Sequence, residues 1–164
     1  WSWNANRTTA QENVVAHNRI HHVMQILSDG GGIYTLGHQP DSFLQGNLIY
    51  DLPLNLGSAE SNGIFMDEGS TGFTVENNLI HSVGRSPIRF HRATTNLVRD
   101  NILGTESGVE MFRYNATQAD KIIKQDNRQI HDSLPPSAAD FKRVAGAGLE
   151  PKFEKLLRKA EQDK

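Results

Sequence analysis

Apolar residues recur along the first two thirds of the chain in short segments that share one pattern, apolar-x-x-Asn-x-apolar. The segments cover residues 15–20, 44–49, 75–80 and 98–103. Their asparagines are Asn18, Asn47, Asn78 and Asn101, at spacings of 29, 31 and 23 residues. A pattern that returns at such intervals is typical of a solenoid, in which each repeat stacks on the next.

A second set of four-residue segments keeps step with the first, beginning at Ile33, Ile64, Ile88 and Val109. Strand side chains alternate between two faces, so we expect positions one and three to point inward and positions two and four outward. The inward set is almost wholly apolar: Ile33, Thr35, Ile64, Met66, Ile88, Phe90, Val109 and Met111. The outward set mixes aromatic and charged groups: Tyr34, Leu36, Phe65, Asp67, Arg89, His91, Glu110 and Phe112. An outer face of this composition suits contact with a ligand.

Together the two sets predict an all-β chain folded as a right-handed parallel β-helix of about four coils, where a coil is one turn of the solenoid. Short strands could also make a β-sandwich, but columns of like residues favour the solenoid. Adjacent coils would lie about 4.8 Å apart. The asparagines would then form a ladder at a bend, with their amides bonded to the turn backbone and to one another.

The ends of the chain depart from the repeat. Residues 1–115 are expected to form the coils, and residues 116–164 an irregular linker with capping helices, although residues 121–124 could add one short strand. Residues 1–9 contain no full coil, so they either cover the first coil or follow coils that are missing. Ser137 and Asp140 fit a helical capping box, and Pro151 suits the start of a second helix through Leu156, Leu157 and Ala160. We expect these helices to cover the last coil and protect its strand edge.

Composition narrows the classes of partner. The chain has 17 basic and 19 acidic residues, and no block of like charge occurs outside its last fourteen residues. Nucleic acid and anionic membrane are therefore not expected as partners. The chain has no cysteine, which excludes disulfides and thiolate metal sites. No apolar run reaches the roughly 20 residues of a membrane span, and we expect no signal peptide in this sequence.

Four segments carry a resemblance to a known family. They read Ser-Asp-Gly-Gly-Gly-Ile-Tyr-Thr-Leu-Gly at 28–37, Gly-Ile-Phe-Met-Asp-Glu-Gly-Ser at 63–70, Asn-Asn-Leu-Ile-His at 77–81 and Pro-Ile-Arg-Phe-His-Arg-Ala at 87–93. They resemble the C-terminal portion of bacterial right-handed parallel β-helix glycoside hydrolases, a group with α-L-fucosidase and xylanase members, and residues 147–157 resemble the end of such chains. Members of that family are typically several times longer.

The resemblance implies a secreted enzyme, extracellular or periplasmic, that acts on a polysaccharide or oligosaccharide and needs no cofactor. It also implies that Asp29 and Asp67 are the catalytic pair, without indicating which of them is the acid. Glycoside hydrolysis uses two carboxyl groups, one protonated and one ionised. In fully extended segments the two aspartates would be on the order of 20 Å apart. They can converge only if Gly30, Gly31 and Gly32 fold the chain back, and the alternative role for Asp29 is that of a turn residue.

Other residues of the outer face are candidates for substrate binding. Tyr34 and Phe65 could stack on sugars or simply pack under a loop, and Glu68 could substitute for Asp67. Arg89 and Arg92 could hold an anionic substituent or form surface ion pairs. His91 lies one coil beyond Asp67 in the same column, where its imidazole could bond to that carboxylate or to sugar hydroxyls.

Two further functions stay open at this stage. A polysaccharide lyase on the same scaffold would use Arg89 or Arg92 as its base, with calcium held by carboxylates such as Asp67 and Glu68. The second open function is that of a non-catalytic carbohydrate-binding or structural β-helix. His21 and His81 occupy equivalent positions about 10 Å apart, which suits a ladder and is too far for a shared metal. An exposed first coil predicts a homodimer.

Overall fold

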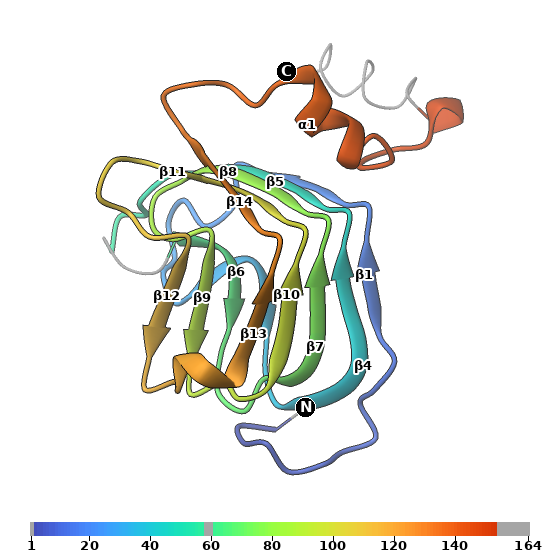
Figure 1. Ribbon diagram of the computed structural model, residues 1–164, viewed down its shortest axis with the longest axis vertical. Helices are drawn as coiled ribbons and strands as arrows, with labels where there is room; N and C mark the ends of the chain where they lie inside the picture. The colour runs from blue at the N-terminus through green and yellow to red at the C-terminus, as the bar shows by residue number, and fades with distance from the viewer. Residues whose placement is uncertain (1, 58–60, 154–164) are drawn as a thin grey trace.

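The computed structural model describes residues 2–57 and 61–153, which form a parallel β-solenoid with three sheets (Figure 1). Each coil contributes one strand to each sheet in turn, and like strands of successive coils pair in parallel. Four coils have all three strands, and the last two strands begin a fifth. The predicted all-β parallel β-helix of about four coils is therefore confirmed.

The strands of the three sheets follow one order along the chain. Sheet A contains β1 (Val14–Ala16), β4 (His38–Gln45), β7 (Thr71–Glu76), β10 (Asn96–Arg99) and β13 (Ile122–Gln125). Sheet B contains β2 (Arg19–His21), β5 (Leu48–Leu52), β8 (Leu79–Val83), β11 (Ile102–Thr105) and β14 (Arg128–His131). Sheet C contains β3 (Gly30–Thr35), β6 (Ser61–Met66), β9 (Ile88–His91) and β12 (Phe112–Asn115).

The core lies inside the solenoid, where inward residues of successive coils stack directly. Ile49 pairs with Ile80 in sheet B, and Ile64 pairs with Ile88 in sheet C, and all four side chains are fully buried. Burying an isoleucine completely contributes about 1.5–3 kcal/mol. Each coil thus gains its stability chiefly from the coils on either side of it.

The corner between sheets A and B carries the predicted asparagine ladder. Asn78 Nδ2 donates to Asn101 Oδ1 at 2.9 Å and to the Leu44 carbonyl at 2.8 Å. Asn47 in turn donates to Asn78 Oδ1 from both its backbone nitrogen and its Nδ2. The amides therefore satisfy backbone groups that the bend leaves unpaired, as the sequence predicted.

The ladder and the repeat continue further than the sequence pattern indicated. Asn127 accepts hydrogen bonds from Asn101, and β13 and β14 stack on β10 and β11 in register. Both strands lie in the segment expected to be an irregular linker. The predicted short strand at 121–124 corresponds to β13.

The fourth strand of sheet C is shifted from its predicted position. Phe112, not Val109, pairs with Ile88, and Tyr114 pairs with Phe90. Tyr114 stacks on the Phe90 ring with centroids 5.5 Å apart, whereas Val109 belongs to a turn in which its N–H bonds to the Glu106 carbonyl. The register predicted for Val109, Glu110, Met111 and Phe112 is therefore wrong, because the alternating pattern fits two frames and the larger rings occupy the core position. Leu36, which was expected to face outward, is also buried.

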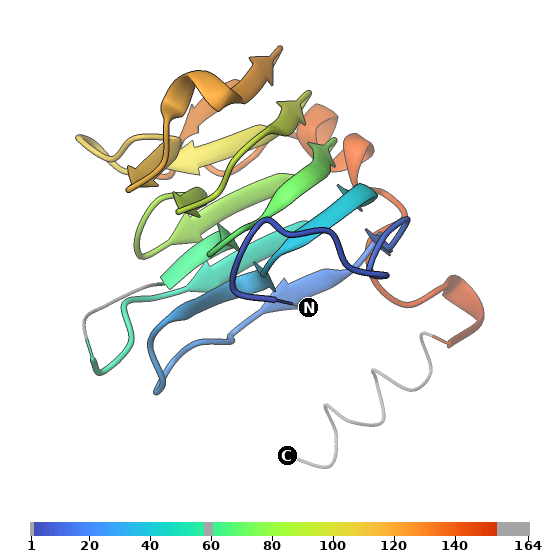
Figure 2. The ribbon, with the colours of Figure 1, turned by 90° about the horizontal axis from the view of Figure 1, so that it is seen from below.

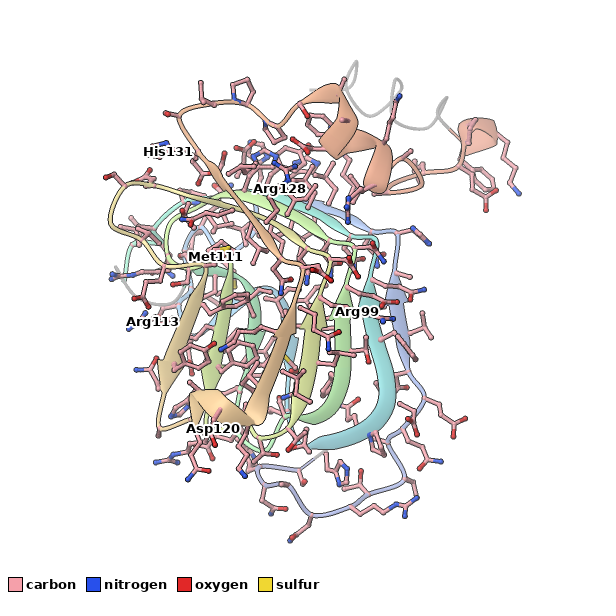
Figure 3. All side chains as sticks on the ribbon, in the orientation of Figure 1. Arg99, Met111, Arg113, Asp120, Arg128 and His131 are labelled. Carbon is pink, nitrogen blue, oxygen red and sulfur yellow. The ribbon has the colours of Figure 1, made fainter. Side chains whose placement is uncertain are left out.

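The C-terminal segment begins with the predicted capping box. Ser137 caps α1 (Ala138–Arg143): its hydroxyl accepts from the Asp140 backbone N–H, and the Asp140 carboxylate accepts from the Ser137 backbone N–H. Burial alone would raise the pKa of Asp140, but hydrogen bonds from Ser137 and the charge of Arg128 outweigh it and hold the pKa below its ordinary value. Arg128 of β14 forms an ion pair with Asp140, and Figure 3 shows it beside α1.

This segment packs along the outside of sheet B instead of covering the last coil. Val144 clusters with Leu48, Leu79 and Ile102, which belong to three successive coils, and Gly148 N–H donates to the His17 carbonyl of the first coil. Figure 2 shows the segment running back along the solenoid. The predicted position of the tail is therefore wrong. Pro151–Phe153 forms a short 3-10 turn, while Leu156, Leu157 and Ala160 of the predicted second helix lie outside the described residues.

The N-terminal segment follows the corner between sheets C and A. Arg7 bridges to His38, Ser2 lies against Gly37, and Asn4 lies against Gly69. In residues 2–57 and 61–153, no helix has the length and hydrophobicity of a membrane span.

Candidate functional site

The candidate site lies on the outer face of sheet C, where residues of successive coils stand side by side. Tyr34 pairs with Phe65 and Phe65 pairs with Arg89, so these three form one column across the strands. A second column contains His91 and Asn115, which pair with each other, and Asp67, which directly follows β6 and precedes His91 by one coil. The parallel stacking thus brings side chains from four loops and strands into one patch.

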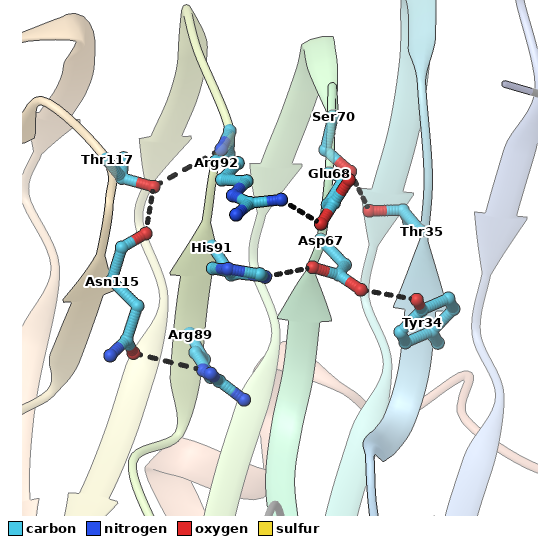
Figure 4. Close-up of polar contacts among 11 residues, drawn as sticks. Tyr34, Thr35, Asp67, Glu68, Ser70, Arg89, His91, Arg92, Asn115 and Thr117 are labelled. Carbon is cyan, nitrogen blue, oxygen red and sulfur yellow. Dashed lines mark hydrogen bonds and ion pairs between the residues drawn. The ribbon is translucent and has the colours of Figure 1, made fainter. Parts of the chain in front are cut away.

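Asp67 is the centre of this patch (Figure 4). Its Oδ2 accepts a hydrogen bond from the Tyr34 hydroxyl at 2.5 Å, and its Oδ1 lies 2.6 Å from His91 Nδ1. The residue is only 5% exposed. A carboxylate can only accept hydrogen bonds, so the His91 nitrogen that faces it carries a hydrogen. The predicted contact between His91 and Asp67 is present.

The pKa of the Tyr34 hydroxyl responds to burial and to the acidic groups around it. Burial raises the pKa of the Tyr34 hydroxyl above its ordinary value, and the hydrogen bond to Asp67 raises it further. The negative charges of Asp67, Asp29 and Glu68 all contribute in the same direction. Asp29 and Asp67, the two predicted catalytic residues, therefore act electrostatically on the same hydroxyl group.

The glycine run beside Asp29 forms the start of β3 and bends the chain there. A side chain at Gly31 would place its Cβ 3.1 Å from the Ile33 carbonyl oxygen and 3.2 Å from the Phe65 nitrogen. In an extended strand a residue two positions away lies about 6.6 Å further along, so the chain bends sharply here. Asp29 itself is exposed and has a left-handed backbone, with φ of 66°. The three glycines nevertheless belong to β3, which pairs in register with β6, so the chain bends here without leaving sheet C.

Two of the predicted substrate-binding residues are buried. Phe65 has no exposed surface, because the Tyr34 ring packs edge-on against it and the Arg89 guanidinium lies 4.3 Å from its centroid. Arg89 is 8% exposed, and its Nε donates to Asn115 Oδ1 at 3.2 Å. In this arrangement Phe65 and Arg89 support the patch from below, while Tyr34 remains 39% exposed at its surface.

Glu68 and Arg92 form an ion pair next to the pair of Asp67 and His91. Arg92 Nη1 lies 2.6 Å from Glu68 Oε1, and the Arg92 side chain is 60% exposed. Figure 4 shows the two cross-coil pairs side by side. The ion-pair alternative for Arg92 is therefore realised in the structure.

The sequence analysis missed one polar member of the patch. Asn115 lies beside His91 in register and accepts from Arg89, but the shifted frame of β12 had placed residues 110 and 112 on this face. An additional hydrogen bond from Ala93 N to Thr117 Oγ1 orders the following turn. The signal that could have found Asn115 is the alternation Phe112-Arg-Tyr-Asn, which repeats the pattern of residues 88–91.

Sheet B carries a separate aromatic ladder on its outer face. His21 stacks on Tyr50 with centroids 4.9 Å apart, and Tyr50 stacks on His81 at 5.5 Å. Burial lowers the pKa of His81 despite the opposing charges of Asp132 and Asp51. The ladder predicted for these histidines is confirmed. Among the residues that the structure describes, no three histidine or carboxylate side chains come together to hold a metal ion.

Comparison with known proteins supports the fold. No protein-family model matches the sequence, and no curated protein matches it. A solved structure named "Glycoside hydrolase" is similar over 94% of this chain, with a TM-score of 0.54 and 19% sequence identity. The chain spans 20% of the length of that protein. At this identity the likeness establishes a shared solenoid fold.

Proposed function

We propose that the chain is a glycoside hydrolase, or the catalytic part of one, that cleaves a polysaccharide or oligosaccharide on the outer face of sheet C. The observation that carries the proposal is the buried Asp67 carboxylate, which points outward and is held by Tyr34 and His91. Its side-chain partners belong to the same outer face, so it contributes nothing to the core. An acidic group placed in this way suits chemistry better than folding.

The two aspartates take different parts in the proposed reaction. Asp67 accepts hydrogen bonds on both oxygens, which stabilise its negative charge. We therefore assign it the role of the ionised carboxylate. Asp29 is exposed and free to approach a leaving-group oxygen, so we assign it the role of acid. This division matches the two-carboxyl chemistry of glycoside hydrolysis.

The surface around the aspartates suits a sugar. Tyr34 presents an exposed ring for stacking, while Glu68, His91 and Arg92 offer polar groups for hydroxyls. The resemblance to enzymes acting on α-L-fucosides and xylan makes these the first substrates to assay. An extracellular or periplasmic site of action and a homodimer through the first coil remain predictions.

The lyase alternative fits the geometry less well. Arg92 already neutralises Glu68, and Arg89 is 8% exposed beneath the patch, so neither is placed to take a proton from the substrate. Calcium needs six to eight oxygen ligands. Asp67 is committed to Tyr34 and His91, and Glu68 to Arg92, which leaves few oxygens for an ion.

The test is hydrolysis of a glycan panel by the wild-type protein and by Asp67→Asn. We expect the wild type to release reducing ends without unsaturated products, and the variant to lose about 10²–10⁴-fold in kcat. Asp120→Asn, at an exposed position of the turn Ala119–Lys121, serves as the matched control. Full activity of Asp67→Asn, with a circular dichroism spectrum like that of the wild type, would contradict the proposal.

A further inference from the structure

We propose that His91 is the general base of the reaction. Nε2 of its imidazole takes the proton of the attacking water, and Asp67 is a positioning residue. This inference rests on the proposed function and assigns the general base within that site. It also predicts the stereochemistry of cleavage.

The first argument is the state of the His91 ring. Its Nδ1 lies 2.6 Å from Asp67 Oδ1 and must carry the hydrogen of that bond, because the carboxylate is an acceptor only. In a neutral imidazole the other nitrogen then has a free lone pair. No hydrogen bond joins Nε2 to another residue in the part of the chain that the structure describes. Among residues 2–57 and 61–153, Nε2 therefore has no partner and its lone pair is available as a base.

The second argument is accessibility. The His91 side chain retains 27% of its surface, whereas the Asp67 side chain retains 7%. Both Asp67 oxygens are also occupied, Oδ1 by His91 and Oδ2 by Tyr34. A water molecule approaching from solvent meets the imidazole more readily than the carboxylate. Asp67 is better placed to orient the ring and to stabilise the imidazolium that forms, as the aspartate does in other Asp-His pairs.

The charged groups around His91 come from three coils. Asp67 and Glu68 lie on the preceding coil. Arg89 lies on β9 with His91, and Arg92 directly follows that strand. Arg113 occupies the position of Arg89 on β12. Arg92 is paired with Glu68, and Arg89 is held by Asn115 and the Phe65 ring. Asp67 is thus the acidic group that contacts the imidazole directly.

The proposed step balances as a single displacement. The water oxygen forms a bond to the anomeric carbon as one of its protons moves to His91 Nε2. The bond from that carbon to the leaving oxygen breaks, and the leaving oxygen takes the proton of Asp29. The products are a sugar of inverted anomeric configuration, an ionised Asp29 and an imidazolium, and solvent then returns each group to its starting state.

The experiment compares the wild type with His91→Asn and His91→Ala. The amide of His91→Asn can still donate to Asp67, so a purely structural role would be preserved in it. We expect both variants to lose about 10²–10⁴-fold in kcat with little change in KM, and added imidazole to raise kcat of His91→Ala with its concentration. His131→Asn, at an exposed position of β14, is the matched control.

Proton NMR of the first product gives an independent result, and inversion is expected. Near-wild-type activity of His91→Asn, or retained configuration in the wild-type product, would overturn the role of His91 and leave the proposed function intact. Absence of glycan cleavage by the wild type would overturn both. Melting temperatures of the variants identify any loss that comes from unfolding.

Discussion

The Tyr34 hydroxyl donates a hydrogen bond to Asp67 at 2.5 Å across 33 positions of sequence. The contact exists because β3 and β6 are stacked with Thr35 opposite Met66, which sets Tyr34 one coil away from Asp67. The tyrosine therefore has a defined part in holding the carboxylate. It fixes one oxygen of the carboxylate, and His91 fixes the other.

Replacing Tyr34 with phenylalanine should lower kcat by about 10–10²-fold, because a hydrogen bond to a charged group contributes about 1.5–3 kcal/mol. The ring would remain, so binding through stacking should change little. Kinetics on a cleaved glycan, with Tyr114→Phe as control, measure the effect, since the Tyr114 hydroxyl accepts from Lys124 outside the site. Equal losses in both variants would contradict a special role for Tyr34.

The same hydroxyl should show its environment in an alkaline titration. Its pKa is raised by burial and by Asp67, so its contribution to stability is complete below about pH 10 and is lost as pH rises toward the higher pKa of the folded state. Ultraviolet absorbance should therefore show one tyrosine that resists ionisation above pH 10, and Asp67→Asn should lower its pKa.

Gly31→Ala tests the bend at the start of β3, beside Asp29. The new Cβ would lie 2.8 Å from the Asn62 carbonyl oxygen and close to two further backbone atoms, none of which can rotate away. We expect a loss of about 1–3 kcal/mol in the free energy of unfolding and a lower kcat/KM. In Gly146→Ala, the control, the nearest atom lies 3.4 Å away in the His17 ring. Wild-type stability and activity of Gly31→Ala would show that the bend is not required.

The asparagine ladder should be strongest at its centre. Asn78→Ala removes the acceptor for two Asn47 donors and the donor for the Leu44 carbonyl, all of them buried. Each buried group left unpaired costs about 1–3 kcal/mol, so a loss of about 3 kcal/mol or more is expected in urea unfolding. Asn18→Ala, at the exposed end of the same ladder, should cost less than about 1 kcal/mol. Similar losses in the two variants would contradict this account.

The sequence pattern does not mark the last coil of the solenoid, and the reason is physical. In the last coil Lys124 takes the register position of Val98, and Gln129 takes that of Leu103. A terminal coil has a neighbour on one side only, so its inner positions need not be apolar. The apolar-x-x-Asn-x-apolar pattern therefore fails at Asn127 even though the ladder continues through it.

The sequence by itself determined the solenoid, the asparagine ladder and the outer column that holds Asp67 and His91. These follow from alternation within a strand and from a spacing repeated along the chain, which are local properties. Tertiary structure decided the register of β12, the burial of Phe65 beneath Tyr34, the path of the C-terminal segment along sheet B and the bonding of Asp67 to two neighbours. Those features depend on how loops of unequal length set one coil against the next, and no single repeat contains that information.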